Sequence, residues 1–366
     1  MNAMIMPTPS VRNVFLFFML LFCNCALAQE GLKVAIAGLS HDHVNPLLNA
    51  YQRHEVNIVG IAEADKALIR RVQDRYKLTD ELFYTTVDEM LKAVKPDVVL
   101  AYNAISEHVD VAEACLPLKI PLMVEKPLAI NNEQAQRIAA LSAQYGTAVF
   151  TNYETTWYKS NQALKQLVDD GGIGTVKKVI VKDGHQGPKE IGCSEAFLSW
   201  LTDPEKNGGG ALIDFGCYGA NLMTWLMKGE RPVAVTAVTR QLKPSVYPNV
   251  DDDATIILEY KGGATGVIQA SWDWPYSIKD MHVYGDRISL HAVDGNTLVR
   301  YSNPRKQENV PVKEDYFTDH LAYLQAALNG SIDVADDLSS LANNLVVVEI
   351  LQAARESAKR GSRVVL

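Results

Sequence analysis

Residues 34–43 read VAIAGLSHDH, a short apolar run that ends in a glycine turn. From this run to about Phe150, short apolar segments alternate with amphipathic helical patterns. The apolar segments lie at 34–37, 57–62, 97–101, 121–124 and 148–150. Strands that alternate with helices predict a parallel sheet with right-handed crossovers. We therefore expect an α/β fold whose first domain, residues 31–150, is a doubly wound, Rossmann-type dinucleotide-binding domain.

After about Asn152 the pattern changes to longer runs that are rich in β-branched residues. These runs lie at 176–181, 233–239, 254–260, 265–272 and 288–292. Lys261-Gly262-Gly263 between two of them predicts a hairpin turn. Helical patterns return at 319–328 and 337–359. We expect an α+β domain over residues 151–366, with a mainly antiparallel open sheet and closing helices that pack back on the first domain.

The first 28 residues are typical of a signal peptide. Arg12 is the one charge among them, and the apolar stretch 14–22 is too short to span a bilayer. Ala26-Leu27-Ala28 supplies an A-x-A cleavage site. We expect cleavage after Ala28, export to a periplasm, and a mature chain without a membrane span. The alternative is an uncleaved tail anchored in a membrane.

Composition excludes two classes of protein. The formal net charge is −8, and no stripe of Lys and Arg interleaved with aromatic residues occurs, so we expect no nucleic-acid partner. The expected mature chain has three cysteines, Cys115, Cys193 and Cys217, and is therefore not a disulfide scaffold. We expect buried free thiols, with one bridge as the alternative.

The glycine turn carries an incomplete dinucleotide fingerprint. Gly38 occupies the first position of G-x-G-x-x-G, but Ser40 and His43 replace the second and third glycines. A serine hydroxyl can itself bind phosphate, whereas a histidine crowds the start of the following helix. The turn therefore predicts either a nucleotide site or a plain strand-to-helix connection.

His41, Asp42 and His43 also resemble a metal-binding cluster. Adjacent side chains point in different directions, and the sequence offers no evident third ligand. We therefore expect no metal.

Glu63 follows the second apolar run, 25 residues after Gly38. An acidic residue at this spacing accepts hydrogen bonds from a ribose 2′-hydroxyl and repels a 2′-phosphate, which favours NAD over NADP. Arg70 and Arg71 soften that preference. The alternative is a carboxylate that faces the dipole at the start of a helix.

Glu125-Lys126-Pro127 closes the apolar run at 120–124. The carboxyl end of a buried parallel strand is where an open sheet forms its ligand crevice. Burial lowers the pKa of a lysine, and a lysine so perturbed can relay a proton from a sugar hydroxyl. The alternative is a charge pair that caps the strand.

Residues 207–221 read NGGGALIDFGCYGAN, a glycine turn that leads into a predicted helix. Asp214, Tyr218 and Asn221 follow one another at spacings of four and three residues, so one helix would carry them on one face. A carboxylate beside a phenol can orient a hydroxyl and share its proton. The alternative is a polar stripe that faces solvent.

These motifs resemble those of the Gfo/Idh/MocA oxidoreductases over about residues 33–366. The resemblance implies that Lys126 lies beside nicotinamide and substrate, that Asp214 and Tyr218 complete the catalytic group, and that His108 matches the family's histidine after the fourth strand. The chain departs from the family pattern at 103–105 and 152–157, besides the glycine turn.

We therefore expect an exported NAD(P)-dependent oxidoreductase that acts on a sugar or polyol, as a homodimer or homotetramer. The alternatives are a redox-neutral glycosidase or lyase with tightly retained NAD, and a sugar-binding protein that has lost its nucleotide. Expected cofactor contacts are Gly38, Ser40, His41, Glu63, Asn103, His108, Glu125 and Lys126. Expected substrate contacts, besides the catalytic group, are Asn152, His185 and Asn221.

Overall fold

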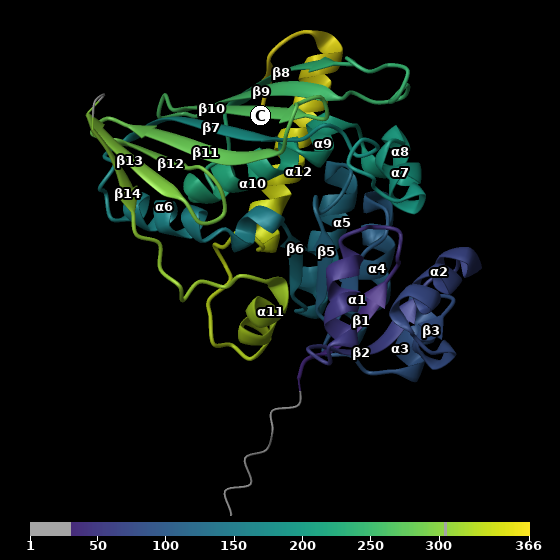
Figure 1. Cartoon of the computed structure of the whole chain (residues 1–366). Coiled ribbons are helices and arrows are strands. Elements are labelled where there is room, and N and C mark those ends of the chain that lie inside the picture. Colours follow the sequence, from purple (N-terminus) through teal and green to yellow (C-terminus); the bar gives the residue numbers. More distant parts are fainter. Residues whose placement is uncertain (1–30, 304–305) are drawn as a thin grey trace, which may run out of the picture. The chain divides into compact units, whose positions relative to one another are not determined.

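The computed structural model describes residues 31–303 and 306–366 (Figure 1). The predicted signal peptide over residues 1–28 lies outside the described residues. Among the described helices, none combines the length and the apolar character that crossing a bilayer requires.

The first domain contains a six-stranded sheet in the order β3-β2-β1-β4-β5-β6. Its neighbouring strands all pair in parallel, which confirms the predicted Rossmann-type topology. The strands are β1 (Lys33–Ala37), β2 (Asn57–Ala62), β3 (Phe83–Tyr84), β4 (Val98–Ala101), β5 (Leu122–Glu125) and β6 (Val149–Asn152).

Helices cover both faces of this sheet. Successive residues of β1 enter two different apolar clusters, Val34 and Ile36 in one and Ala35 and Ala37 in the other. This alternation is what a strand buried on both faces requires. The helices are α1 (Val44–Gln52), α2 (Lys66–Tyr76), α3 (Val87–Ala93), α4 (His108–Cys115) and α5 (Asn132–Tyr145).

The second domain contains a nine-stranded sheet in the order β14-β13-β12-β11-β7-β10-β9-β8-β15. Its neighbours pair antiparallel except β7 and β10, which run parallel, so the expected mainly antiparallel sheet is confirmed. The strands are β7 (Val176–Gly184), β8 (Ala234–Arg240), β9 (Asp253–Glu259), β10 (Thr265–Ser271), β11 (Ile278–Gly285), β12 (Ser289–Ala292), β13 (Leu298–Asn303), β14 (Lys306–Val310) and β15 (Val364–Val365).

One face of this sheet packs against α6, α10 and α12; in Figure 1, α6 and α10 lie beneath the sheet and α12 runs behind it. On β9, Ala254, Ile256 and Leu258 are buried, whereas Ile257 between them is exposed. The helices of this domain are α6 (Lys159–Asp169), α7 (Glu195–Leu201), α8 (Pro204–Asn207), α9 (Ala211–Asp214), α10 (Gly216–Leu226), α11 (His320–Leu328) and α12 (Leu341–Arg360).

Helix α12 joins the two domains. On the second-domain side, Ser357 Oγ accepts a hydrogen bond of 2.9 Å from the backbone N–H of Ala237. On the first-domain side, Arg355 donates to the carbonyl oxygen of Ile130 at 2.8 Å, and Gln352 accepts from the N–H of Asn132 at 2.9 Å. The closing helix therefore holds the connection between β5 and α5, and the start of α5, against the second domain.

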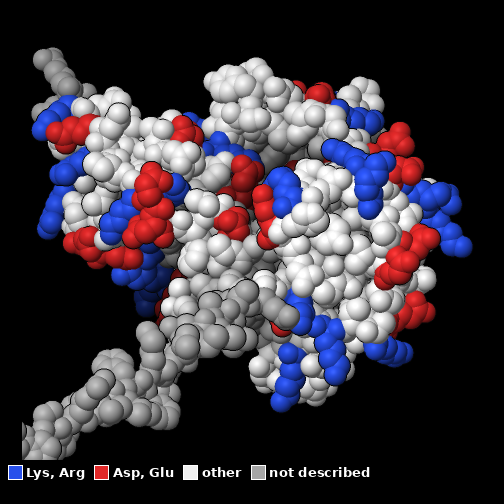
Figure 2. All heavy atoms as spheres, turned by 60° about the horizontal axis from the view of Figure 1, so that its bottom comes forward, with Lys and Arg blue, Asp and Glu red and all other residues white. Residues whose placement is uncertain are grey.

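The surface and the cysteines also bear on function. The face in Figure 2 carries Lys and Arg interspersed with Asp and Glu. Cys115, Cys193 and Cys217 are free thiols. Burial raises the pKa of the Cys115 thiol to about 12, so this cysteine stays protonated and unreactive.

Candidate active site

A first cavity of about 780 Å³ opens at the carboxyl ends of β1, β2 and β4. This is the place where an open parallel sheet binds its ligand. Four of the residues expected to contact cofactor line it, namely Gly38, Ser40, Glu63 and Asn103.

The turn after β1 brings these strand ends into close contact. Gly38 has a φ of +80°, and a Cβ at this position would lie 2.6 Å from Cβ of Asn103, so only glycine fits. The N–H of Leu39 donates to the carboxylate of Glu63 at 2.9 Å. A glycine at the closest approach and an acidic residue at the end of β2, beside an open cavity, fit a dinucleotide.

The other expected cofactor contacts lie outside the lining of this cavity. His41 is buried, and so is His108, whose Nδ1 bonds to the carbonyl oxygen of Leu128 at 3.1 Å. Glu125 is buried as well, and its carboxylate accepts from Asn152 Nδ2 at 2.8 Å.

The structure also brings Glu125 next to His41 and His43, a third group that the sequence did not reveal. Nδ1 of His41 accepts the backbone N–H of His43 at 3.1 Å, so the proton of a neutral His41 is on Nε2. Nε2 of His41 has no hydrogen-bond partner among the described residues, whereas Nδ1 of His43 lies 2.8 Å from the carboxylate of Glu125. The three groups therefore form a cluster that is linked through His43.

A second cavity of about 790 Å³ lies beside the first, because two segments of the chain contribute residues to both linings. Ser40 lines the first cavity and His43 the second. Helix α7 also contributes to both cavities: Trp200 lines the first, and Phe197 lines the second. Lys126, Asp214, Tyr218 and His185 line the second cavity. The residues expected to be catalytic therefore meet in one place, beside the dinucleotide cavity.

Lys126 and Asp214 form a buried ion pair. Nζ of Lys126 donates to Oδ1 of Asp214 and, at 3.1 Å, to the backbone carbonyl oxygen of the same residue. Burial on its own would lower the pKa of Lys126, but the adjacent carboxylate of Asp214 outweighs it and raises that pKa above its ordinary value. The expectation of a lowered lysine pKa was wrong, because the sequence did not show this pairing.

Asp214 ends one helix and does not lie on the next. The sequence predicted a single helix with Asp214, Tyr218 and Asn221 on one face, but the chain breaks between α9 and α10. The carbonyl oxygen of Asp214 accepts from Lys126 instead of continuing a helix. Asn221 is buried between α10 and α12, where its Nδ2 donates to the carbonyl oxygen of Leu338 at 2.8 Å, so it does not line the cavity.

The carboxylate of Asp251 folds the glycine turn before α9. It accepts the N–H of Gly210 at 2.9 Å and that of Leu212 at 2.7 Å. A Cβ on Gly210 would lie 1.8 Å from the backbone oxygen of Asp251, so this position requires glycine. The turn aims Asp214 at Lys126, and the indole N–H of Trp272 holds its other oxygen at 2.9 Å.

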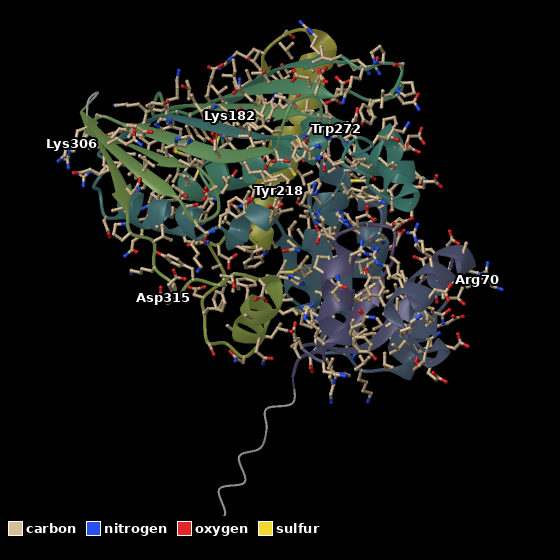
Figure 3. All side chains as sticks on the ribbon, viewed as in Figure 1. Arg70, Lys182, Tyr218, Trp272, Lys306 and Asp315 are labelled. Atoms are coloured by element: carbon tan, nitrogen blue, oxygen red, sulfur yellow. The ribbon has the colours of Figure 1, made fainter. Side chains whose placement is uncertain are left out.

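The ring of Tyr218 lies close to two ammonium groups. The centre of its ring is 5.1 Å from Nζ of Lys126 and 4.5 Å from Nζ of Lys279. Figure 3 labels Tyr218 and Trp272, which lie between the second-domain sheet and the first domain. Burial first, and then the charge of Asp183, raise the pKa of Tyr218 well above its ordinary value, so the phenol keeps its proton.

The residues of the far wall of the second cavity were not predicted from the sequence. Lys279 on β11 pairs with the carboxylate of Glu154, which also accepts from Tyr158 Oη at 2.7 Å. Lys279 stands opposite Asp183 of β7 in the sheet register. Both carboxylate oxygens of Asp183 are buried without a hydrogen-bond partner among the described residues, and burial raises its pKa. The charges of Lys279 and Asp280 hid the strand character of this segment in the sequence.

Of the two remaining residues expected to contact substrate, one lines the second cavity and the other does not. His185 lines the second cavity, with its ring 4.8 Å from that of Phe215. Asn152 does not line it, because its amide bridges the carboxylate of Glu125 and the indole N–H of Trp157.

The Rossmann-type sheet and the cavity at its ligand edge are typical of a dinucleotide-binding protein, and comparison with known proteins identifies the family. Residues 32–153 match the family described as "Oxidoreductase family, NAD-binding Rossmann fold", and residues 161–291 match "GFO/IDH/MocA C-terminal domain". Together these segments cover more than half of the chain. The chain belongs to the GFO/IDH/MocA family, and its first domain is an NAD-binding Rossmann domain.

Curated relatives include two enzymes named trans-1,2-dihydrobenzene-1,2-diol dehydrogenase. The enzyme of Xenopus tropicalis is 26% identical over 215 residues, which are 58% of this chain and 60% of that protein. The enzyme of Bos taurus is 25% identical over 240 residues, 65% of this chain and 67% of that protein. The chain thus spans about 60% of the length of the first of these relatives.

Solved structures with the same fold include an aldose-aldose oxidoreductase from Caulobacter crescentus in complex with glycerol. It is 20% identical, with a TM-score of 0.75 over 92% of this chain and 100% of that one. An inositol dehydrogenase homologue from Azotobacter vinelandii in complex with NAD+ is 17% identical, with a TM-score of 0.76 over 92% and 98%. At these identities the likeness shows the fold.

Proposed function

We propose that the protein is an NAD-dependent dehydrogenase that interconverts a hydroxyl and a keto group on a sugar or polyol. The observation that carries this proposal is the Lys126–Asp214 pair, which lines a cavity beside the dinucleotide cavity. The names of the relatives, which concern diol, inositol and aldose oxidoreductases, support an alcohol substrate.

Bound NAD supplies the hydride acceptor or donor. Gly38, Ser40, Glu63 and Asn103 are the residues that would hold it, since they line the first cavity. Glu63 keeps a carboxylate at the end of β2, which favours a free ribose hydroxyl over a 2′-phosphate.

Lys126 acts on the substrate oxygen as an ammonium group. Because Asp214 keeps the lysine protonated, Nζ donates a hydrogen bond to an oxygen that gains negative charge during hydride transfer. Asp214 fixes the position of Nζ, and Trp272 fixes the position of Asp214.

Tyr218 forms the floor of the cavity. Its phenol is protonated, so it donates to a substrate hydroxyl, and its ring faces Lys126 and Lys279. His185 lines the same cavity and gives it a further polar wall. A cavity of about 790 Å³ with several fixed donors suits a polyhydroxylated substrate.

The test is a search for turnover with the purified chain. Sugars and polyols are offered with NAD+ or NADP+, and reduced nicotinamide is followed by its absorbance. We expect oxidation of at least one of them, with NAD+ preferred. The acid-quenched protein is also analysed by mass spectrometry for bound nucleotide.

Each outcome has a meaning. If the protein retains nucleotide and converts a sugar without net reduction of nicotinamide, the proposed dehydrogenase is replaced by a redox-neutral enzyme. No bound nucleotide and no thermal stabilisation by either dinucleotide would overturn the proposal.

A further inference from the structure

The second cavity contains two imidazoles, His43 and His185, and their hydrogen bonds differ. Nδ1 of His43 lies 2.8 Å from Oε2 of Glu125. The side chain of His43 is 42% exposed, while that of Glu125 is 2% exposed. A buried carboxylate thus holds an imidazole that reaches into the substrate cavity.

The partner of Nδ1 decides which ring nitrogen has the lone pair. A carboxylate only accepts, so Nδ1 of His43 carries the proton and Nε2 has the lone pair. No described residue forms a hydrogen bond with this Nε2. His185 is reversed, because its Nδ1 accepts the N–H of Gly187 at 2.9 Å and its Nε2 carries the proton. Of the two imidazoles, His43 is therefore the proton acceptor.

Glu125 is itself held as a carboxylate in a fixed position. Its other oxygen accepts from Asn152 Nδ2 at 2.8 Å, and Asn152 accepts in turn from Trp157 Nε1 at 3.0 Å. Burial on its own would raise the pKa of Glu125, but His43, His41 and Asn152 together lower it below its ordinary range. The carboxylate therefore stays ionised and keeps its hold on Nδ1.

The other two groups expected to move protons are poor acceptors. Asp214 keeps Lys126 in its ammonium form, and Tyr218 keeps its phenolic proton. Oxidation of an alcohol nevertheless releases a hydroxyl proton, which needs an acceptor in the cavity.

We propose that His43 and Glu125 form an acid–base dyad in which Nε2 of His43 accepts the hydroxyl proton of the substrate. The dyad rests on the proposed dehydrogenase function. As the O–H bond breaks, an N–H bond forms at Nε2, the carbon loses its hydride to NAD, and C=O forms. Glu125 is the positioning residue, since its carboxylate stabilises the imidazolium that results.

The dyad explains the most conspicuous departure in the glycine turn. His43 occupies the third position of the fingerprint, where a glycine normally lets helix and strand approach closely. Here the residue precedes α1 and turns its ring toward the end of β5. The histidine that weakens the nucleotide motif thus adds a base to the neighbouring cavity.

Charged and titratable groups surround the dyad on every side. His41 Nε2 lies 3.9 Å from Oε2 of Glu125, and Asp42 is the chain neighbour of His43. Glu154 and His320 interact electrostatically with His43 from the second domain.

The first experiment measures kcat/KM against pH for the wild type, His43→Gln and His185→Gln, with the substrate that the turnover search identifies. For His43→Gln we expect a loss on the order of 10²–10⁴-fold and loss of the acid limb. His185→Gln lowers kcat/KM but keeps that limb. Glu125→Gln weakens the reaction as well and shifts the limb. An unchanged acid limb in His43→Gln would overturn the dyad.

The second experiment needs no substrate and separates the dyad from the dehydrogenase function. Diethyl pyrocarbonate acylates accessible imidazole nitrogens that have a lone pair, and peptide mass spectrometry locates the product. We expect His43 to react on the order of tenfold faster than His185. We also expect Glu125→Gln to slow the reaction at His43. Equal or reversed reactivity of the two histidines would contradict the dyad even if no sugar is oxidised.

Circular dichroism and thermal unfolding accompany both experiments. Because His43 is partly exposed, His43→Gln should fold as the wild type does. A variant that loses activity at an unchanged melting temperature has then lost the chemical step and not its fold.

Discussion

Lys126 and Asp214 are 88 positions apart in the sequence and are joined by two hydrogen bonds, one to the carboxylate and one to the backbone carbonyl oxygen. The lysine follows β5 of the first domain, and the aspartate ends α9 of the second. The pair therefore connects the two domains at the cavity where both contribute reactive groups.

Asp214→Asn tests this pair through stability. The change leaves a buried ammonium without its counter-charge, which costs about 3–5 kcal/mol when one partner of a buried pair is removed. We expect a lower melting temperature and a fall in kcat/KM. Asp273→Asn is the matched control, because Asp273 is partly exposed and lies 3.8 Å from Lys243. Equal stability of the two variants would contradict the buried pair.

Lys126→Met tests the ammonium group itself. We expect kcat/KM to fall on the order of 10²-fold or more, because no donor then faces the charge that develops on the substrate oxygen. NAD affinity, measured by titration of protein fluorescence, should change little, since Lys126 lines the second cavity and not the first. A variant that turns over normally would remove Lys126 from the reaction.

Much of the first domain could be predicted because its signals are local. Apolar runs separated by amphipathic helices predict a parallel sheet, and parallel strands bring their carboxyl ends to one edge. Gly38, Glu63 and Lys126 could therefore be assigned to the ligand edge from their positions after β1, β2 and β5. Each of these assignments needs only the strand that precedes the residue.

What could not be predicted depends on contacts between distant segments. Strand β11 reads IKDMHVYG, with charges that hide its strand character, because Lys279 faces a polar cavity. The end of α9 depends on the hydrogen bond that Lys126 donates to the carbonyl oxygen of Asp214, and its start on the carboxylate of Asp251, which accepts from the N–H of Leu212. The ionisation of Lys126 and the orientation of His43 depend in the same way on partners far away in the sequence.

Gly210→Ala tests the turn that places Asp214. A methyl group there would overlap the backbone oxygen of Asp251, which cannot move without breaking its neighbouring hydrogen bonds. We expect a loss of about 2–4 kcal/mol in the free energy of unfolding, measured by urea titration. Gly262→Ala is the control, because no atom lies within 4 Å of the position that its methyl group would occupy. Gly210→Ala should therefore unfold at a lower urea concentration than Gly262→Ala.

Glu63→Gln tests the preference for NAD. The amide keeps an acceptor for the N–H of Leu39 but removes the negative charge that repels a 2′-phosphate. We expect NAD+ to bind more weakly and NADP+ more tightly, measured by isothermal titration calorimetry. Glu133→Gln, at an exposed position in the first turn of α5, should leave both affinities unchanged. If Glu63→Gln leaves the ratio of the NAD+ and NADP+ affinities unchanged, Glu63 does not contact the ribose.

We expect acid to destabilise this protein above the range in which carboxylates titrate, with His108 as one cause. Burial lowers the pKa of His108 from 6.5 to about 4. Between these values the unfolded chain binds a proton that the folded chain does not, so stability rises with pH. The contribution is complete above pH 6.5 and is lost as pH falls toward 4. His41 and His320, whose pKa values burial also lowers, act in the same direction.

His108→Asn isolates this contribution. The amide retains a donor for the carbonyl oxygen of Leu128 but cannot titrate. Between about pH 6.5 and pH 4.5 the wild type should lose about 2–3 kcal/mol more than the variant, measured by urea unfolding at each pH. His54→Asn is the control, since His54 is exposed and its φ of 59° suits asparagine. If His108→Asn and the wild type lose stability in parallel, burial does not lower the pKa of His108 in the folded protein.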